Sequence, residues 1–489
     1  MATPRSRPPA PRGGAAPRSR VRSQSTAKLA ACLVVAAAAT APTTGFVTRN
    51  GSVLLLDGLP YRAAGANAYW LGLDENGGVR YPSRFRTTDA LETLAGWLGP
   101  GALVRGTTLG VSTGGPLSFE PALGVFNGSA LLAADFAIAE AERLGLRLIV
   151  PLTDNGAHYA GGKRDFVRWL GLPEDDDGAA FYSDARAVAA FEDYVRARLE
   201  HVNAFTGRRA ADEPAIAMWE TGNELMAPAN WTASLARFIK RVAPRHLVLD
   251  GSYWAQQSAA ERAAHLAIAE VDAVTDHFYP PDAARLAAAL GETAAAQKAF
   301  TLGEFGWADG AKLDAMLDVC AAAQACATAA PWSFFPHADD HGFVEHGDGF
   351  TFHFPGWNSS AALHLVGAVR NFSWFVRQPH PQPQPEPYVG PSTAPAVTTA
   401  APGLVGWRGA ALSGAYAVQV APAPGGPWRY ASNNSSSGRP RDSDTPWRVP
   451  GGAAVVGAGS WVRVRGLGFD DGAAAGPWSK AVQVVQQGK

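Results

Sequence analysis

Two glutamates of the sequence lie directly after short apolar runs, among other polar side chains. Glu224 ends the stretch WETGNE at 219–224, which follows the apolar residues AIAM, and Glu304 lies in LGEFG at 302–306. Hydrolysis of a glycosidic bond requires one carboxyl group that protonates the leaving oxygen and a second that attacks the anomeric carbon or activates water. A single glutamate is usually a member of a surface ion pair, whereas two that face each other across one site would supply this chemistry.

Side chains suited to binding a carboxylate or a sugar follow other apolar runs of the chain. Arginine can hold a carboxylate through two hydrogen bonds, amide, imidazole and phenol groups can hydrogen-bond hydroxyls, and an aromatic ring can stack on the apolar face of a sugar. The candidates of these kinds are Arg105, Asn155, Asn223, His277, Tyr279, Trp332 and Trp70. The structural alternatives are an ion pair for Arg105 and core packing for Tyr279 and Trp332.

These side chains must be positioned by a regular framework, and the apolar pattern predicts one. Eight strand-like runs alternate with segments of helical periodicity, such as 130–145 and 185–202. This alternation predicts an α/β fold, a (β/α)8 TIM barrel, whose active-site groups come from the carboxyl ends of the strands. The sequence lacks the glycine fingerprint of a doubly wound dinucleotide fold. The strands are predicted at 61–67, 102–108, 146–154, 215–220, 246–252, 271–279, 300–306 and 330–335.

Composition divides the chain into four parts. Residues 1–41 form a targeting segment, with a basic, Ser-containing start and a 12-residue apolar run that is too short to span a bilayer. It predicts secretion; a plastid transit peptide and an uncleaved membrane anchor are the alternatives. The catalytic barrel is placed at 45–378 and a proline-rich linker at 379–403. Apolar and polar residues alternate between Gly/Pro turns over 404–489. This pattern predicts a small all-β sandwich, which resembles a fibronectin type III module.

Charge and composition exclude several classes of partner. The net charge is −1, and Lys/Arg runs are absent beyond the first 30 residues, so we expect no binding to nucleic acid and no stable membrane insertion. The histidines and aspartates of 337–353 and the acidic run at 174–178 lack a recognised metal-ligand spacing. We therefore expect a monomer that binds an uncharged substrate and needs neither a metal nor another cofactor.

Two cysteines remain beyond the targeting segment. Cys320 and Cys326 lie in an alanine-rich stretch predicted to be helical, where a separation of six residues gives about 9 Å of rise, beyond the reach of a disulfide. Buried thiols are expected, and a disulfide would require the helix to break between them. Seven Asn-x-Ser/Thr sequons are typical of a secreted glycoprotein; they begin at Asn50, Asn127, Asn230, Asn358, Asn371, Asn433 and Asn434.

Several ordered motifs carry a resemblance to a known family. VRGTT, WETGNE, DHFYP and LGEFG are similar to the pattern of glycoside hydrolase family 5, whose retaining enzymes carry their two carboxyls on strands four and seven. GANAYWLGL, the long segment from RLGLRLIVPLTDNG to WETGNE, and PWSFF resemble the endo-β-1,4-mannanase branch of that family. The resemblance covers about 45–378 and implies hydrolysis of internal bonds in mannan or glucomannan.

The resemblance implies a role for each matching residue. Glu224 would be the general acid/base and Glu304 the nucleophile. To start as an acid, Glu224 would need its pKa raised by burial or by the charge of Glu304. The remaining roles are substrate binding by Asn223, support of Glu304 by Arg105 and Tyr279, contact with the acid/base by His277, a sugar-stacking floor at Trp332, and further sugar platforms at Trp70, Tyr159, Trp307 and Trp357.

One departure from the family pattern affects the substrate prediction. Many family members have proline after the acid/base, where this chain has Leu225. The neighbouring loop therefore has its own shape, and a β-1,4-glucan or another β-glycan remains an alternative substrate. A non-catalytic glycan-binding protein on the same fold is the alternative from another class.

Overall fold

The computed structural model describes most of the chain beyond the predicted targeting segment. The described residues are 45–174, 178–354, 359–377, 389–431, 440–443, 445–468 and 474–486. The predictions for residues 1–41, for the acidic run at 175–177, for Trp357 and for the sequons at Asn358, Asn433 and Asn434 lie outside them. Among the described residues, none of the helices is both long and apolar enough to cross a membrane.

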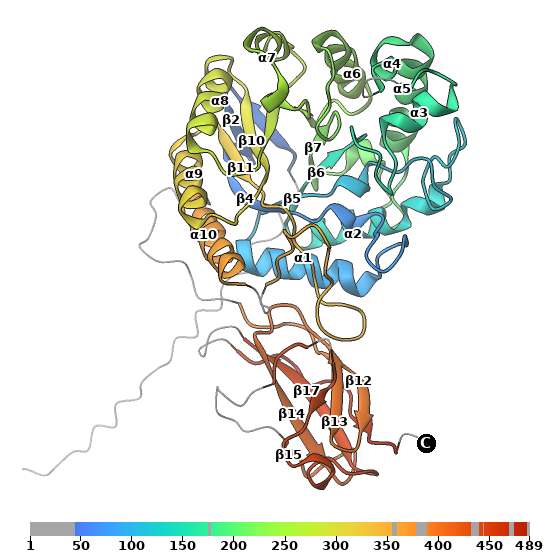
Figure 1. Cartoon of the computed structure of the whole chain (residues 1–489), viewed down its shortest axis with the longest axis vertical. Helices are drawn as coiled ribbons and strands as arrows, with labels where there is room; N and C mark the ends of the chain where they lie inside the picture. Colours follow the sequence, from blue (N-terminus) through green and yellow to red (C-terminus); the bar gives the residue numbers. More distant parts are fainter. Residues whose placement is uncertain are drawn as a thin grey trace, which may run out of the picture. The chain divides into compact units, whose positions relative to one another are not determined.

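Eight parallel strands close into a barrel, which confirms the predicted fold (Figure 1). The closed order is β10-β11-β4-β5-β6-β7-β8-β9. The alanine, valine and leucine side chains of these strands are buried because helices cover the outside of the sheet. The strands are β4 Ala63–Asn67, β5 Leu103–Arg105, β6 Arg147–Pro151, β7 Ile216–Glu220, β8 Leu247–Asp250, β9 Ala273–Phe278, β10 Ala299–Phe305 and β11 Cys326–Ala329.

Several of the helices begin where the sequence supplies capping groups. Ser83 accepts from the N–H of Arg86 at the start of α1, and Ser258 with Glu261 forms a capping box on α7. Such caps satisfy N–H groups that have no partner within the helix, and they fix the residue at which these helices start. The helices are α1 Arg84–Leu98, α2 Leu132–Arg143, α3 Lys163–Trp169, α4 Ala180–Ser183, α5 Ala185–Glu200, α6 Ala229–Val242, α7 Ala259–Leu266, α8 Ala283–Ala295, α9 Gly310–Ala322 and α10 Ser360–Arg377.

A small antiparallel sheet precedes the barrel and shares its apolar core. It consists of β1 (Val47–Asn50), β2 (Val53–Leu56) and β3 (Leu59–Pro60). Val47 and Leu54 belong to one buried cluster with residues at or near the amino ends of the barrel strands. The polar side chains that the sequence analysis singled out lie at the opposite, carboxyl ends.

The eighth barrel strand lies earlier in the chain than predicted. The strand is Cys326–Ala329, not 330–335, and Trp332 therefore follows the strand instead of belonging to it. The residues CATA were assigned to the preceding helix because alanine favours helices. Tertiary pairing of β11 with both β10 and β4 overrides that preference.

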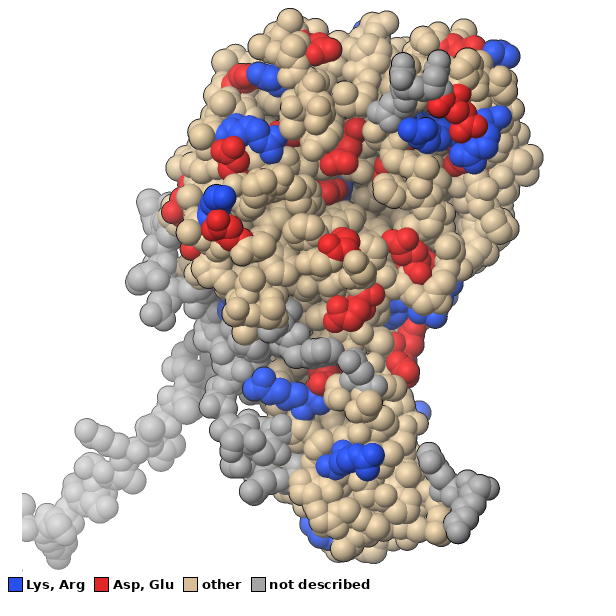
Figure 2. Space-filling model, in the orientation of Figure 1, with Lys and Arg blue, Asp and Glu red and all other residues tan. Residues whose placement is uncertain are grey.

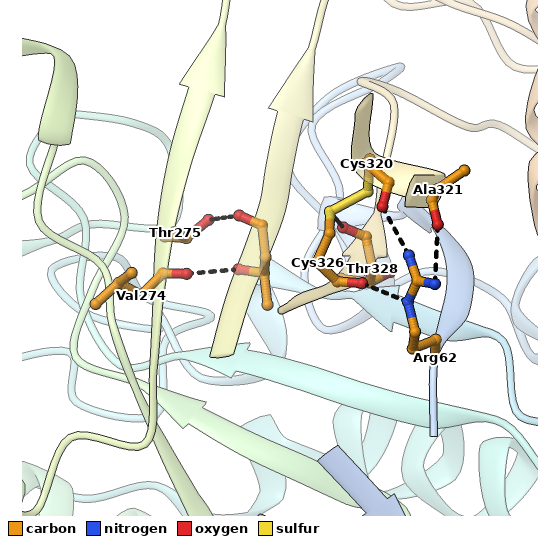
Figure 3. The surroundings of a disulfide bond; sticks show 8 residues. Arg62, Val274, Thr275, Cys320, Ala321, Cys326 and Thr328 are labelled. Atoms are coloured by element: carbon orange, nitrogen blue, oxygen red, sulfur yellow. Dashed lines mark hydrogen bonds between the residues drawn. A yellow bond between two sulfur atoms is a disulfide. The ribbon is translucent and has the colours of Figure 1, made fainter. Parts of the chain in front are cut away.

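A disulfide joins Cys320 and Cys326, so the prediction of buried thiols is wrong (Figure 3). Helix α9 ends at Ala322 and β11 begins at Cys326, which brings the two Cα atoms to 5.4 Å. Arg62 donates to the carbonyl oxygens of Cys320, Ala321 and Cys326 around this turn. These hydrogen bonds satisfy carbonyls at the end of the helix, and burial lowers the pKa of Arg62 to about 10.

The C-terminal part is all-β, as predicted, and contains two antiparallel sheets. The order is β12-β13-β16 in one sheet and β15-β14-β17-β18 in the other, around a valine-rich core. Strand β12 falls inside the stretch predicted as linker, because its Thr and Ala residues pair with β13. The strands are β12 Ala396–Ala401, β13 Leu404–Arg408, β14 Ala415–Ala421, β15 Arg429–Tyr430, β16 Trp447–Arg448, β17 Trp461–Leu467 and β18 Val482–Gln483.

Candidate active site

Two glutamates meet an imidazole at the carboxyl ends of the barrel strands. Glu304 lies in β10, and Glu224 lies in the loop that follows β7, at a left-handed φ of 52°. Such a backbone is rare for a residue with a side chain, and it clusters at functional sites. Figure 2 shows acidic side chains in and around a hollow on this face of the molecule.

His277 connects the two carboxyl groups. Its Nδ1 lies 2.7 Å from Oε1 of Glu224 and 3.6 Å from Oε2 of Glu304. One side-chain atom from each of the three residues lies within 4.8 Å of the other two. Glu304 is almost buried, whereas the side chain of Glu224 is 35% exposed. The site therefore offers one enclosed carboxylate and one that an incoming group can reach.

Arg105 holds Glu304 as part of a buried network at the end of β5. Its NH1 donates to Oε1 of Glu304 at 2.7 Å, and its NH2 donates to Oδ1 of Asn223 at 2.8 Å. The Nε and NH2 groups also donate to the two carboxylate oxygens of Glu220, each at 2.8 Å. Asn67 accepts a further bond from NH1 at 3.2 Å. This planar fork fixes Asn223 and Glu304 in one orientation.

Tyr279 binds the second oxygen of Glu304. Its hydroxyl donates to Oε2 at 3.0 Å. Burial and the negative charge of Glu304 raise the pKa of Tyr279 far above its usual value, so the phenol keeps its proton and remains a donor. Both oxygens of Glu304 therefore have a donor, and the carboxylate cannot rotate freely.

The pKa of Glu224 lies below its ordinary value, which contradicts the expectation of a raised pKa. Burial raises it, but the hydrogen bond from His277 and the positive charges of His277, Arg105 and His158 together outweigh burial. The pKa of His277 is raised, because the charge of Glu304 and the bond to Glu224 outweigh the effect of burial. The two shifts place the shared proton on the imidazole in the free site.

A hollow of about 280 Å³ lies beside the carboxyl pair, lined by loops that follow β4, β5, β6, β7 and β11. Trp332 is half-buried at its wall, and Tyr69 stacks on this indole with ring centres 4.9 Å apart and planes 16° apart. The Trp332 Nε1–H donates to Asp348 at 2.6 Å. These contacts fix the ring beside the hollow, where a sugar can pack on it. Asn223, Asp154, His158 and Tyr159 also line the hollow.

Three predicted site residues take other places. Trp70 is fully buried under Arg86 and against Phe335, so the prediction that it is a sugar platform is wrong. Trp307 is also buried and donates to the carbonyl of Trp332. Asn155 is half-buried, and its backbone N–H donates to the carbonyl of Asn223. The hollow is lined by its neighbour Asp154 and not by Asn155.

Sequence reasoning gave no role to two buried acids of the site. Glu220 is the first glutamate of WETGNE and forms the two bonds to Arg105 described above. Asp154 Oδ2 accepts from Nδ2 of Asn223 at 3.0 Å. The signal for Glu220 was its place as the last residue of a buried strand, where an acid needs a partner. Asp154 ends a predicted strand in the same way.

Leu225, where the usual family pattern has proline, forms two backbone hydrogen bonds to the neighbouring loop. Its backbone N–H donates to the carbonyl of Gly251 at 3.0 Å, and its carbonyl accepts from Tyr253. A proline at this position would lack the N–H group. The loop that carries Glu224 is therefore tied to the neighbouring loop after β8 by a bond that leucine allows.

The barrel and its mouth define a (β/α)8 protein with a carboxyl-pair site. The model of the family described as GH family 5 beta-mannosidase-like matches residues 44–289, half of the chain, and the chain belongs to this family. Its similarity to curated proteins includes 34% identity over 228 residues to putative mannan endo-1,4-beta-mannosidase P of Arabidopsis thaliana, covering 43% of this chain and 52% of that one.

Other relatives are also plant proteins. Mannan endo-1,4-beta-mannosidase 3 of Arabidopsis thaliana is 31% identical over 220 residues, covering 42% of this chain and 50% of that one. Mannan endo-1,4-beta-mannosidase 4 of Oryza sativa subsp. japonica is 31% identical over 272 residues, covering 50% of this chain and 57% of that one. The chain spans about half the length of the curated relatives it matches.

Solved structures share the fold. An endo-1,4-beta-mannanase from Rhizomucor miehei superposes with a TM-score of 0.56 at 20% identity, covering 67% of this chain and 99% of that one. An endo-beta-1,4-mannanase from Thermotoga petrophila gives a TM-score of 0.55 at 19% identity, covering 87% of this chain and 98% of that one. At such low identity the similarity concerns the fold alone.

Proposed function

We propose that the protein is a retaining endo-β-1,4-mannanase that hydrolyses internal bonds of mannan and glucomannan. The observation that carries the proposal is the carboxyl pair: oxygens of Glu224 and Glu304 lie within 4.8 Å at the mouth of the barrel. Retaining glycosidases place their carboxyl groups about 5–5.5 Å apart, and inverting enzymes place them about 6.5–9.5 Å apart. The names of the plant relatives support the choice of mannan.

The geometry assigns a role to each group in the proposed reaction. Glu304, held by Arg105 and Tyr279, attacks the anomeric carbon and forms a glycosyl-enzyme. The proton that His277 shares with Glu224 passes through the Glu224 carboxyl to the leaving oxygen, and Glu224 then accepts one from the water that releases the sugar. The sugar in the hollow stacks on Trp332, and its 2-hydroxyl binds the amide of Asn223.

We also propose that the protein is secreted and glycosylated and that its C-terminal part is a fibronectin type III-like spacer. The disulfide between Cys320 and Cys326 supports an oxidising compartment. A spacer role is supported by Trp407, which is buried in the sheet core, and by Trp428, whose ring is covered by Arg463 at 4.2 Å. Expression in a eukaryotic host, with the protein measured in medium and cells and its glycans by mass spectrometry, tests this assignment.

The test of the enzymatic function is release of reducing ends from β-1,4-mannan, glucomannan and β-1,4-glucan. We expect the full chain to cut mannan and glucomannan, and Glu224→Ala and Glu304→Ala to lose about 10³-fold or more of the activity. Glu200→Ala, at an exposed helix end, is the matched control. Release from glucan alone would change the substrate, and binding without release from any of the three would favour a non-catalytic glycan-binding protein. The anomer formed first, followed by NMR, distinguishes retention from inversion.

A further inference from the structure

Asp154 forms the outer end of a hydrogen-bonded chain that leads to Glu304. Its Oδ2 accepts from Nδ2 of Asn223 at 3.0 Å, Oδ1 of Asn223 accepts from Arg105 at 2.8 Å, and Arg105 donates to Glu304 at 2.7 Å. Asp154 is 4% exposed. A buried carboxylate is costly unless its oxygens are paired, and the second oxygen accepts from the backbone N–H of Gly156 at 2.6 Å.

The backbone at this point is fixed independently of the side chains. Asn223 N–H donates to the carbonyl of Thr153 at 2.9 Å, and Asn155 N–H donates to the carbonyl of Asn223 at 3.0 Å. These bonds extend the pairing of β6 with β7 past the strand ends. The carboxylate of Asp154 is therefore not needed to hold the two loops together, and its contact with the Asn223 amide requires another explanation.

An asparagine amide can be placed in two orientations that differ by exchange of oxygen and nitrogen. Arg105 can only donate and an ionised carboxylate can only accept, so Arg105 and Asp154 together enforce one orientation. One Nδ2 hydrogen of Asn223 binds Asp154, and the other stays available at the hollow that Asn223, Asp154 and Trp332 line.

We propose that Asp154 is a positioning residue, which acts through Asn223 to aim the remaining N–H at the substrate. The proposal rests on the proposed function, in which Asn223 binds the 2-hydroxyl of the sugar beside Trp332. A hydrogen bond that strengthens in the transition state needs a donor already oriented before the reaction begins. Asp154 supplies that orientation without touching the substrate's reacting atoms.

The ionisation of Asp154 makes the proposal testable by pH. Burial raises its pKa to about 6, opposed by the positive charge of His158, the N–H of Gly156, the amide of Asn223 and the charge of Arg105. The exposed His158 lies 3.6 Å from Oδ1, and Arg105 faces the carboxylate from β5. As the pH falls through about 6, Asp154 gains a proton and no longer acts as a purely accepting partner.

The first experiment is a double-mutant cycle on mannan. Asp154→Ala is expected to lower kcat about 10-fold with KM changed less than about twofold. In an Asn223→Ala background the same change should have less than about a twofold effect, because the residue through which it acts is gone. Equal fold losses in both backgrounds, or a loss confined to KM, would overturn the proposal.

The second experiment follows pH. In the parent, kcat should fall as the pH decreases through about 6; in Asp154→Asn this decrease should disappear, while kcat is lower at neutral pH. Asp250→Asn is the matched control, because Asp250 is another buried acid at a strand end, 2.6 Å from His265. It should keep the parent's pH profile. An unchanged profile in Asp154→Asn would contradict the proposal.

An NMR measurement separates this proposal from the proposed function. The side-chain amide resonances of Asn223, assigned by comparison with Asn223→Ala, should shift with a midpoint near pH 6 in the parent and not in Asp154→Asn. This titration requires no turnover. A parent that cuts none of the polysaccharides would refute the proposed function, whereas an amide that ignores the charge of Asp154 would refute the positioning role.

Discussion

At the scale of single residues, the charge on Arg105 organises the site. The guanidinium is buried and shared between Glu220 and Glu304. Burial lowers its pKa, but the two carboxylates outweigh burial and raise the pKa above its usual value. One fixed cation is therefore shared by two acids, of which Glu220 is structural and Glu304 is the proposed nucleophile.

Replacement of Arg105 by lysine should disrupt the pairing with Glu220 and Glu304. Lysine has one ammonium group and cannot donate in a planar fork to Glu220 while also reaching Glu304 and Asn223. We expect Arg105→Lys to lower kcat about 100-fold and the free energy of unfolding by about 3 kcal/mol, because Glu220 loses paired hydrogen bonds in a buried position. Steady-state kinetics and urea unfolding measure the two effects.

The matched control is Arg86→Lys. Arg86 is also buried and paired with an acid, Asp74, but its guanidinium lies over the Trp70 ring, away from the carboxyl pair. The Arg86→Lys variant should be less stable than the parent, and its kcat should stay close to that of the parent. Parent-like kinetics of Arg105→Lys would contradict its proposed role.

In the proposed reaction, His277 sets the pH range over which Glu224 acts as an acid. The hydrogen bond from His277 and its charge lower the pKa of Glu224. Removal of the ring should raise the pKa of Glu224 itself, but it also removes the imidazole that holds the shared proton and whose own pKa is raised. We expect His277→Ala to lower kcat about 10-fold or more and to move the alkaline limb of kcat/KM to lower pH, because a carboxyl alone releases the proton before the imidazole would.

The measurement is a pH–rate profile of both proteins on the same soluble mannan. His265→Ala serves as the control, because His265 is buried and bound to Asp250 but does not contact Glu224. A limb that stays in place, or moves to higher pH, would show that His277 does not hold the proton for Glu224.

At the scale of elements, the sequence predicted seven of the eight strands at nearly the right place and erred at the eighth. The first seven are mostly apolar runs with a polar residue in or just after their carboxyl-terminal half, so burial and periodicity identify them. The strand CATA carries no such signal, because alanine is a helix former and its sheet partners are remote in the chain. The same error hid the disulfide, since pairing of Cys320 with Cys326 depends on where α9 ends.

The site was predictable to a similar degree. The site residues meet because they lie at or just past the carboxyl ends of parallel barrel strands, and these ends converge at one mouth. They are Arg105, Asn223, Glu224, His277, Tyr279 and Glu304. The error at Trp70 has a physical cause: Trp70 lies in a short helical turn after β4 and points into the core. The orientation of one indole after a strand depends on loop packing, which the pattern of apolar residues does not encode.

The disulfide should stabilise the junction of α9 and β11. It closes a short loop, for which the entropy of the unfolded chain gives about 2 kcal/mol. We expect the double variant Cys320→Ser, Cys326→Ser to have a free energy of unfolding in urea that is lower by about 2 kcal/mol. Its kcat at 25 °C should be unchanged, because Cys326 begins β11 whereas the carboxyl pair lies at the other end of the barrel.

Reduced and oxidised parent protein provide the internal comparison for this experiment. Reduction of the parent should lower its stability to that of the double variant, and the same reductant should not affect the double variant. A loss of kcat without a loss of stability would show that this turn influences the active site.

At the scale of the whole molecule, residues 42–489 form one compact unit. Leu412, at a left-handed φ of 63°, belongs to the apolar cluster of the barrel. A side chain at Gly96 of α1 would meet Leu412 at 2.4 Å, so glycine makes room for it. The guanidinium of Arg408 lies 3.9 Å from the centre of the Phe85 ring. The all-β part thus shares buried contacts with the barrel.

A buried ion pair at the same contact should make stability depend on pH. Nδ1 of His337 lies 2.9 Å from Asp89 of α1, and Nε2 lies 3.3 Å from Asp442 of the all-β part. Burial lowers the pKa of His337, but the two acids outweigh burial and raise it from 6.5 to about 10. A raised pKa in the folded state means that the stabilisation is complete below about pH 6.5 and is lost as the pH rises through about 10.

Urea unfolding between pH 6 and pH 10 tests this contact. The free energy of unfolding of the parent should decrease across the range, and His337→Gln should be less stable at pH 6 and depend less on pH, because glutamine cannot carry the charge. His364→Gln is the control, since His364 is exposed on α10 and bound to Asp314 at 2.9 Å. Equal pH slopes in parent and His337→Gln would mean that the buried pair does not bind the two parts together, whereas a smaller slope in His337→Gln alone would assign the alkaline loss of stability to this one imidazole.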